Sequence, residues 1–369
     1  MNKTTNWIVG IIIIAVVIWF GFLNKPTEPV STEPIKIGVI LPLTGDAASY
    51  GQTAQRGVEL AVEKIKNEDG IDVEVIFEDS QIDPAKAVSS LQKLINLDNI
   101  DYVLGFSSGE TLAMCPISNL NEVILMTIGT SPEITGCGDY TFRDSPSDIY
   151  QGIVLAEKVS DNNYENIALI YINNDYGVGL KTEFEKNFEG NILLTESFGL
   201  GETDFRTQLT KIKTAEPEAI VLIGIFPEVG RLLKQRAELD ILAPIFGSEG
   251  VKNDSLFEEV PADMLDDIYA IFTAQYEGSE YQEFKNAHLQ RYGEEYGAFS
   301  DYVYDNILTL VDAIKRCKDF NDVECVKENI YKTDIVGATG RIEFDENGDV
   351  INKLYSLYKV ENNEFIEVE

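Results

Sequence analysis

Hydrophobic and polar residues follow two different periods along the chain from Ile35 onward. Short apolar runs are typical of buried strands, and the stretches between them have the three-to-four-residue spacing of amphipathic helices. The predicted strands are 35–41, 73–79, 102–106, 123–128, 166–172, 192–198, 219–224, 244–248 and 267–272, and the helices between them include 50–70, 83–97 and 109–121. Apolar strands that alternate with helices indicate parallel sheets covered on both faces.

The strand–helix rhythm breaks near residues 146–150 and then starts again. We therefore predict an α/β fold with two doubly wound lobes, each built on a mainly parallel sheet. Three later helices, which we expect to return to the first lobe, and a strand-like tail follow: 279–292, 300–317, 322–333, and the tail with a hairpin turn at ENGD, 346–349. The predicted division is 35–147 and 273–351 for lobe 1, and 148–272 and 352–369 for lobe 2.

A different pattern precedes Ile35. The run from Trp7 to Leu23 has no charged side chain, and its 17 residues would span about 26 Å as a helix, close to the thickness of a hydrocarbon core. Residues 1–25 are predicted to be a transmembrane signal anchor or a cleaved signal peptide, and the lack of a small-x-small cleavage site favours the anchor. Residues 26–34, PTEPVSTEP, are a predicted Pro-rich tether. Together they predict an extracytoplasmic domain that is membrane-anchored, or secreted or periplasmic if the segment is cleaved.

The charge and the motif content exclude several classes of function. The net charge is −34, with 63 acidic and 29 basic residues, so the surface repels phosphate backbones and we expect no nucleic-acid partner. The chain has one histidine and no Cys-x-x-Cys pair, and the loop DENGD at 345–349 lacks the ligand pattern of an EF-hand. The phosphate-binding and dinucleotide-binding glycine motifs are also absent. We predict no metal, no cofactor and no enzymatic activity.

The sequence GFSSG at 105–109 matches the nucleophile elbow of α/β-hydrolases, with Ser107 at its centre. A catalytic serine needs a histidine as its base. The only histidine, His288, lies in the middle of a predicted helix among polar residues, where we expect a solvent-exposed imidazole. The sequence therefore disfavours a hydrolase.

The four cysteines are Cys115, Cys137, Cys317 and Cys325. An even number outside the cytosol predicts two disulfides. The stretch CKDFNDVEC, between two predicted helices, suggests a Cys317–Cys325 bond, and Cys115–Cys137 would follow by elimination. Four buried free thiols are the alternative.

The loops that follow the strands are rich in Gly, Ser, Thr and Tyr: LPLTGDAASYG, GFSSGE, TIGTSPE, INNDYG, GIFPE and FGSEG. In open parallel sheets, ligands bind at the carboxyl ends of the strands. A serine-rich turn before a helix offers hydroxyls and unpaired N–H groups to a carboxylate, although each serine alone is equally explained as a helix N-cap. Glu249 in FGSEG is suited to an ammonium group. Together these groups predict a site for an α-amino acid.

At these loops the sequence resembles the extracytoplasmic solute-binding proteins of branched-chain amino acid ABC transporters, which have the type I periplasmic-binding-protein, or venus-flytrap, fold. The resemblance covers the chain from Ile35 onward. The segments that carry it, in order, are IKIGVILPLTGDAASYGQTAQRGVELAVEKIKN, FEDSQIDPAKAV, GFSSGETLA, ILMTIGTSPEIT, FRDSPSD, ALIYINNDYGVGL, FPEVGRLLKQ and FGSEGV.

The resemblance implies a set of ligand-binding residues. Ser108 matches the serine that binds the ligand carboxylate, with Ser107 as the adjacent candidate, and Glu249 matches the acid that meets the ammonium. The remaining implied contacts are Tyr50, Ile128, Gly129, Thr130, Tyr176 and Phe226, with Ile225 as the alternative to Phe226. The cysteines do not match the family disulfide, which would lie near residues 82 and 107.

The resemblance also implies a function. The protein would capture a small amino acid, of the branched-chain type, by hinge closure and deliver it to ABC permease subunits in the membrane. Two alternatives share the fold: a ligand-sensing receptor ectodomain that signals through a separate subunit, and a binder of a related amide such as urea.

Overall fold

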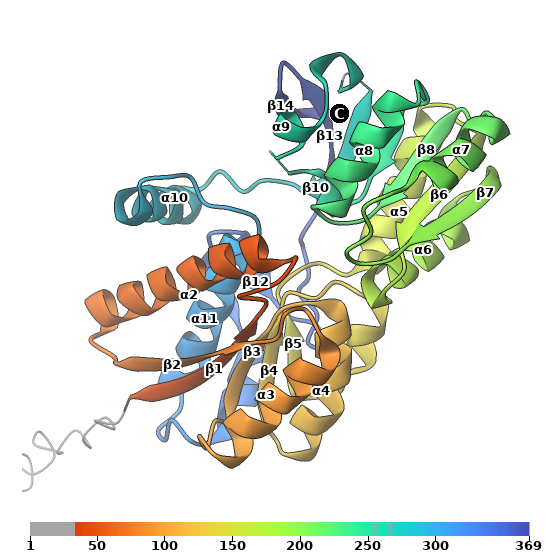
Figure 1. The fold of residues 1–369 in the computed structure, drawn as a ribbon. Coiled ribbons are helices and arrows are strands. Elements are labelled where there is room, and N and C mark those ends of the chain that lie inside the picture. Colours follow the sequence, from red (N-terminus) through yellow and green to blue (C-terminus); the bar gives the residue numbers. More distant parts are fainter. Residues whose placement is uncertain (1–33, 254, 266, 369) are drawn as a thin grey trace, which may run out of the picture. The chain divides into compact units, whose positions relative to one another are not determined.

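The computed structural model describes residues 34–253, 255–265 and 267–368, and the chain from Ile35 onward forms one compact unit (Figure 1). The predicted membrane helix and nearly all of the predicted tether fall on residues 1–33, outside the described residues. Within the described ranges, we find no helix with the length and apolarity needed to cross a bilayer.

The first sheet has five parallel strands in the order β2-β1-β3-β4-β5. Its elements are β1 (Ile35–Leu41), α2 (Ala48–Asp69), β2 (Val73–Asp79), α3 (Pro84–Asn96), β3 (Tyr102–Gly105), α4 (Ser108–Leu120), β4 (Ile124–Thr127), η1 (Pro132–Gly136) and β5 (Thr141–Arg143). Side chains alternate between the two faces of a strand. Val39 therefore belongs to the core on the side of α2, while Ile40 packs with Leu91 of α3 and Met114 of α4.

The second sheet has seven strands in the order β14-β13-β10-β9-β8-β6-β7. The strands β6 to β10 are parallel, and β13 and β14 join as an antiparallel edge. Its elements are α5 (Asp148–Asp161), β6 (Asn166–Ile172), α6 (Asp175–Asn187), β7 (Asn191–Phe198), α7 (Arg206–Ala215), β8 (Ala219–Ile223), α8 (Glu228–Glu238), β9 (Ile245–Gly247), η2 (Glu249–Val251), α9 (Leu256–Glu259), η3 (Ala262–Met264), β10 (Ile268–Thr273), β13 (Tyr355–Glu361) and β14 (Glu364–Val368). The α/β class and the mainly parallel sheets agree with the prediction.

The segment between β10 and β13 returns to the first sheet, as Figure 1 shows. It contains α10 (Ser279–Tyr292), α11 (Ser300–Lys315), α12 (Val323–Ile330) and the hairpin β11 (Asp334–Gly337) and β12 (Gly340–Glu343). The helix α11 packs against α2, β3 and β4, and α10 also contacts α2. The ENGD turn forms where expected, with Gly348 at φ 80° and a bridge between Phe344 and Val350. The exact residues at which the lobes divide stay a prediction.

Three short segments connect the two sheets, namely 144–147, 274–278 and 351–354, and they contact one another. The Ala274 N–H donates to the Leu354 carbonyl at 2.8 Å, and the Tyr355 hydroxyl donates to the Pro146 carbonyl at 3.3 Å. Within two of these segments, the Nζ atom of Lys353 lies 3.6 Å from Oδ1 of the fully buried Asp144. The connections therefore form one shared, partly charged crossing between the two sheets.

Two disulfides are present, Cys115–Cys137 and Cys317–Cys325. The first joins α4 to the residue that follows η1, and the second joins the residues after α11 to α12. No free cysteine exists in the described residues, so the alternative of buried thiols is wrong.

Candidate functional site

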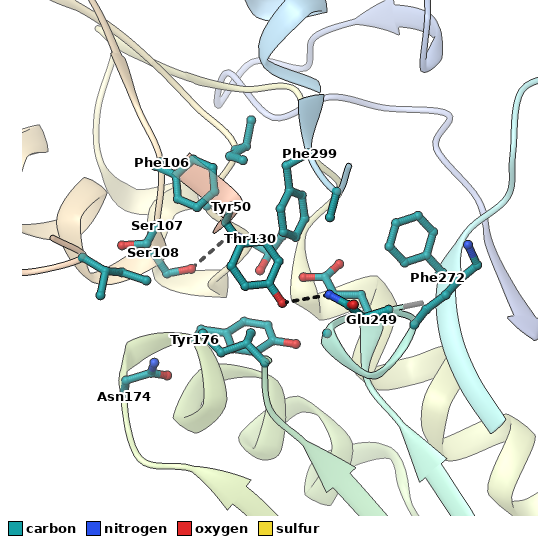
Figure 2. Close-up of a pocket in the computed structure, with 18 residues that line it drawn as sticks. Tyr50, Phe106, Ser107, Ser108, Thr130, Asn174, Tyr176, Glu249, Phe272 and Phe299 are labelled. Atoms are coloured by element: carbon teal, nitrogen blue, oxygen red, sulfur yellow. Dashed lines mark hydrogen bonds between the residues drawn. The ribbon is translucent and has the colours of Figure 1, made fainter. Parts of the chain in front are cut away.

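A pocket lies where the loops that follow the strands of both sheets meet (Figure 2). The first sheet contributes the loops after β1 to β4, and the second contributes the loops after β6, β8 and β9. Strand β10 and the residues before α11 complete the wall. The lining residues are Tyr50, Ile82, Phe106, Ser107, Ser108, Ile128, Gly129, Thr130, Asn174, Tyr176, Ile225, Glu249, Gly250, Lys252, Asn253, Phe272, Ala298 and Phe299.

The two serines of GFSSG have different roles at the start of α4. Ser107 is the N-cap, and its hydroxyl and backbone N–H both donate to the buried carboxylate of Glu110, at 2.6 and 3.0 Å. The Oγ atom of Ser108 accepts the N–H groups of Thr130 and Ser131 at 3.2 and 3.1 Å. A hydroxyl has two acceptor positions and one donor. The proton of Ser108 is therefore left to donate toward the pocket, whereas Ser107 mainly stabilises the helix.

The loop after β4 comes very close to the start of α4 at Gly129. A Cβ atom at this position would lie 3.0 Å from the Cα of Ser108 and 2.9 Å from a methyl group of Ile134. Only glycine permits this approach without displacing its neighbours. The carbonyl oxygens of Ile128 and Gly129 accept the Ser145 hydroxyl at 2.8 and 3.3 Å, which fixes the backbone of the loop from behind.

The opposite side of the pocket is acidic. The carboxyl of Glu249 faces the cavity at the start of η2, and its backbone N–H donates to the side-chain oxygen of Gln151 at 3.0 Å. Gln151 in turn donates to Asp148 at 3.0 Å. Burial raises the pKa of Glu249 to about 7, although hydrogen bonds from Gln151 and Thr130 oppose the shift. Burial thus makes this carboxyl easier to protonate near neutral pH than an exposed glutamate.

Asp148 is a second buried acid next to Glu249. Burial, and then the neighbouring charge of Glu249, raise the pKa of Asp148 well above its usual value. Its Oδ2 atom and the hydroxyl of Tyr176 are buried without a hydrogen-bond partner in the described part of the chain. Unpaired buried polar groups cost free energy. A ligand that carries a positive charge and hydrogen-bond donors would lower the cost of the unpaired acid. A nearby cation favours the ionised forms of Asp148 and Glu249.

An aromatic wall encloses the space between these polar groups. The ring of Phe299 lies 5.8 Å from that of Tyr50 and 5.9 Å, edge to face, from that of Phe106. The Tyr50 hydroxyl accepts the backbone N–H of Phe226 at 3.1 Å and the side-chain amide of Asn253 at 3.4 Å, so it bonds to loops of the second sheet. Phe299 has φ 67°, a left-handed conformation that bulky residues rarely adopt.

The structure brings nearly all of the predicted ligand-binding residues to this one pocket. The predicted residues that line it are Tyr50, Ser107, Ser108, Ile128, Gly129, Thr130, Tyr176 and Glu249. Phe226 does not line it, because its buried ring packs toward Gly230 of α8 and the preceding residue, Ile225, faces the cavity instead. Of the two residues weighed at this position, Ile225 is the one in the wall.

Several lining residues were not predicted from the sequence. Phe106 adjoins the predicted serines, so its place in the wall has a sequence signal. Phe272, Ala298 and Phe299 come from β10 and the return segment, where no polar loop motif marks them. Asn174 and Gly250 lie in loops that are expected at the site, whereas Ile82, Lys252 and Asn253 lie outside all of the expected loops.

His288 is not solvent-exposed as predicted. Its side chain is completely buried, with its ring against those of Phe284, Tyr292 and Tyr296, and its Nδ1 atom bonds to the Glu294 carbonyl at 3.0 Å. The polar neighbours in the sequence concealed this aromatic environment. Burial also lowers the pKa of His288. Since Ser107 bonds to Glu110, the geometry offers no serine–histidine pair.

The chain belongs to the periplasmic binding protein family, whose profile matches residues 34–364. It is a type I periplasmic binding protein of the branched-chain amino acid transporter group. Its homologues are solute-binding proteins and not enzymes, and the family is extracytoplasmic and works with ABC permeases.

Particular relatives show how far the likeness extends. A leucine-, isoleucine-, valine-, threonine- and alanine-binding protein of Pseudomonas aeruginosa is 28% identical over 347 residues, covering 89% of this chain and 90% of the relative. The branched-chain amino acid substrate-binding protein LivJ of Streptococcus pneumoniae, solved with isoleucine, is 29% identical with a TM-score of 0.82, covering 91% of this chain and all of the other. A solute-binding protein of R. palustris solved with benzoate has a TM-score of 0.84 at 17% identity, covers 91% of this chain and 96% of the other, and shows the fold alone.

Proposed function

We propose that this protein captures a small α-amino acid, of the branched-chain type, and delivers it to an ABC importer. The observation that carries the proposal is the polarity of the pocket. Hydroxyl donors lie at Ser108 and Thr130 on the first-sheet side. The carboxyl of Glu249 lines the same pocket from the second sheet, and Asp148, which does not line the pocket, is buried next to it. A zwitterion satisfies both sides, because its carboxylate accepts from the hydroxyls and its ammonium pairs with the acids.

In this proposal the ligand joins the two lobes. Its carboxylate binds Ser108 and Thr130, its ammonium binds Glu249, and its apolar side chain packs on Tyr50, Phe106 and Phe299 with Ile225 opposite. A ligand that contacts both lobes favours the arrangement in which they lie together, which is the basis of hinge closure. The permease subunits would then recognise the closed arrangement.

An aromatic acid is a weaker candidate, although a fold relative was solved with benzoate. Benzoate has no cation to offer Glu249 and Asp148, so these buried acids would stay unpaired or protonated. The names of the more similar relatives point the same way, since they specify leucine, isoleucine and valine. The acidic side of the pocket therefore favours an amino acid.

Isothermal titration calorimetry with matched ligands tests this proposal. Leucine, isoleucine and valine are compared with 4-methylpentanoate, which is leucine without its amino group, and with 3-methylbutylamine, which is leucine without its carboxylate. We expect at least one of the amino acids to bind and each single-charge analogue to bind ~100-fold more weakly or worse, since each loses a buried ion pair. Tighter binding of 4-methylpentanoate, benzoate or urea than of any amino acid would refute the proposal.

Delivery is tested separately from binding. Proteoliposomes that contain the cognate permease and ATPase should import the amino acid only when the binding protein is added. Ligand binding without stimulated uptake, together with activation of a signalling partner, would favour the receptor alternative.

A further inference from the structure

A buried arginine lies behind the pocket wall. Arg143 ends β5, and its side chain is completely inaccessible to solvent. Its Nη1 atom donates to the carbonyl oxygens of Thr130 at 2.9 Å and Ser131 at 2.8 Å. One guanidinium nitrogen therefore holds two consecutive peptide groups of the loop that lines the pocket.

The orientation of these peptides matters for the pocket. In a trans peptide the C=O and the following N–H point in opposite directions. Because Arg143 draws the Thr130 carbonyl away from the pocket, the N–H of Ser131 points toward Ser108, whose Oγ it meets at 3.1 Å. The same carbonyl accepts the N–H of Asp148 at 2.8 Å. Arg143 thus fixes the orientation of the Thr130 carbonyl. Through this peptide it orients both the contact with the Ser108 hydroxyl and the start of α5.

The charge of Arg143 is balanced by Asp349. The Nε atom bonds to Oδ1 at 2.9 Å and Nη2 lies 2.7 Å from Oδ2. Thr135 joins the pair, because its hydroxyl accepts from Nη2 at 3.0 Å and donates to Asp349 at 2.6 Å. A buried guanidinium is tolerable only with such a paired and hydrogen-bonded partner.

Asp349 comes from a distant part of the sequence. It ends the turn that begins at Asp345, whose carboxylate accepts its N–H at 3.0 Å. The Arg143 N–H donates to the Gly348 carbonyl at 2.8 Å, and the Val350 N–H donates to the Arg143 carbonyl at 2.9 Å. The chain then continues directly into 351–354, one of the three connections between the sheets. The arginine therefore links the pocket loop to the crossing between the two sheets.

We propose that Arg143 and Asp349 form a clamp that positions the Thr130–Ser131 loop for the ligand carboxylate. They are positioning residues, since neither lines the pocket. The assignment rests on the proposed function only for the identity of the ligand. The geometric part concerns the orientation of two peptide groups and exists without any ligand.

The test uses three clamp variants and one matched control. Arg143→Lys keeps the positive charge but loses the planar guanidinium that makes several hydrogen bonds at once. Asp349→Asn keeps the shape of the side chain but removes its negative charge. Thr135→Val removes only the hydroxyl that bridges the pair. The control is Arg341→Lys, because Arg341 forms the same two-bonded pair with Asp334, at 2.9 and 3.0 Å, on the exposed β11–β12 hairpin. Leucine affinity is measured by calorimetry, and amide exchange of Thr130 and Ser131 is measured by NMR in the unliganded protein.

We expect Arg143→Lys and Asp349→Asn to raise the Kd for leucine about tenfold or more and to speed exchange at both amides, because hydrogen bonds to a charged group are lost. Thr135→Val should raise the Kd about two- to threefold, and it keeps the test decisive if the charged variants do not fold. Arg341→Lys should change neither quantity. Wild-type Kd and exchange in the clamp variants, or a lower unfolding midpoint with an unchanged Kd, would overturn the proposal. If the wild type binds no amino acid, the proposed function fails, and amide exchange alone decides whether the clamp exists.

Discussion

The charge state of Glu249 gives a sharp prediction, because its pKa of about 7 lies within reach of ordinary buffers. An ammonium ligand pairs with the ionised carboxylate of Glu249. The affinity for leucine should therefore be highest well above pH 7 and should fall as the pH drops through 7. The apparent Kd scales as one plus the ratio of protonated to ionised Glu249. It should therefore rise about tenfold between pH 8 and pH 6, and about another tenfold by pH 5. Asp148 is the other acid at this side of the pocket, and its raised pKa adds to the same trend.

Glu249→Gln is the informative variant, since glutamine keeps the shape but removes the charge. We expect leucine binding to weaken by about 2–5 kcal/mol, the usual cost of removing one partner of a buried charge pair, and the dependence on pH above 6 to flatten. The matched control is Glu228→Gln, because Glu228 is also a buried acid of the second-sheet side, with a pKa raised by burial, but it does not line the pocket. Calorimetry at pH 5, 6, 7 and 8 measures all three proteins. A wild-type Kd that stays constant over this range, or an unchanged Kd in Glu249→Gln, would refute the reasoning.

Two further predictions concern the first-sheet side of the pocket. Ser108→Ala should weaken leucine binding about tenfold with little change in stability. Ser107→Ala should instead lower the free energy of unfolding by about 1 kcal/mol, because an N-cap is lost, and leave the Kd for leucine unchanged. Calorimetry and urea denaturation measure both variants, and the opposite pattern of effects would contradict the site geometry. Phe299→Gly should weaken leucine binding about tenfold, because the ring contacts are lost. The free energy of unfolding should change by less than ~1 kcal/mol, because relief of the backbone strain at φ 67° offsets the lost packing. A large loss of stability would contradict the assumption that this φ is strained.

The strands and the polar loops were predictable because their signals are local. The predicted strands 35–41 and 166–172 coincide with β1 and β6, since each is a continuous apolar run bounded by turn residues. The loops after these strands had to meet at one edge of a parallel sheet, and this rule alone brought Ser108 and Thr130 together. The FGSEG loop indicated Glu249 as the acid for an ammonium group, and the resemblance to a family added Tyr176.

Residues whose role depends on distant partners could not be predicted. Phe299 reaches the pocket through a return segment that follows the second sheet, so no nearby motif marks it. Arg143 lies in FRDSPSD, where a charged residue suggests a surface loop, and only the fold supplies Asp349 from 206 residues away. His288 is a different case, because Phe284 and Tyr292 lie one helical turn before and after it in α10, and only Tyr296 comes from the chain that follows the helix. The helical spacing of these aromatic residues was therefore a local signal that the prediction of an exposed imidazole overlooked.

The Cys115–Cys137 bond has a consequence for the order in which a ligand meets the two halves of the site. It ties α4, whose first residue Ser108 bonds to the loop carrying Thr130, to Cys137 just after η1, the element that follows this loop. A covalent tie of this kind leaves little freedom to lose when a ligand arrives. We expect the ligand carboxylate to bind first to the preorganised first-sheet side of the pocket, and Glu249 of the second sheet to contact the ligand afterwards. Glu249 would then mainly set the dissociation rate of the ligand, while the loop carrying Ser108 and Thr130 would mainly set its association rate.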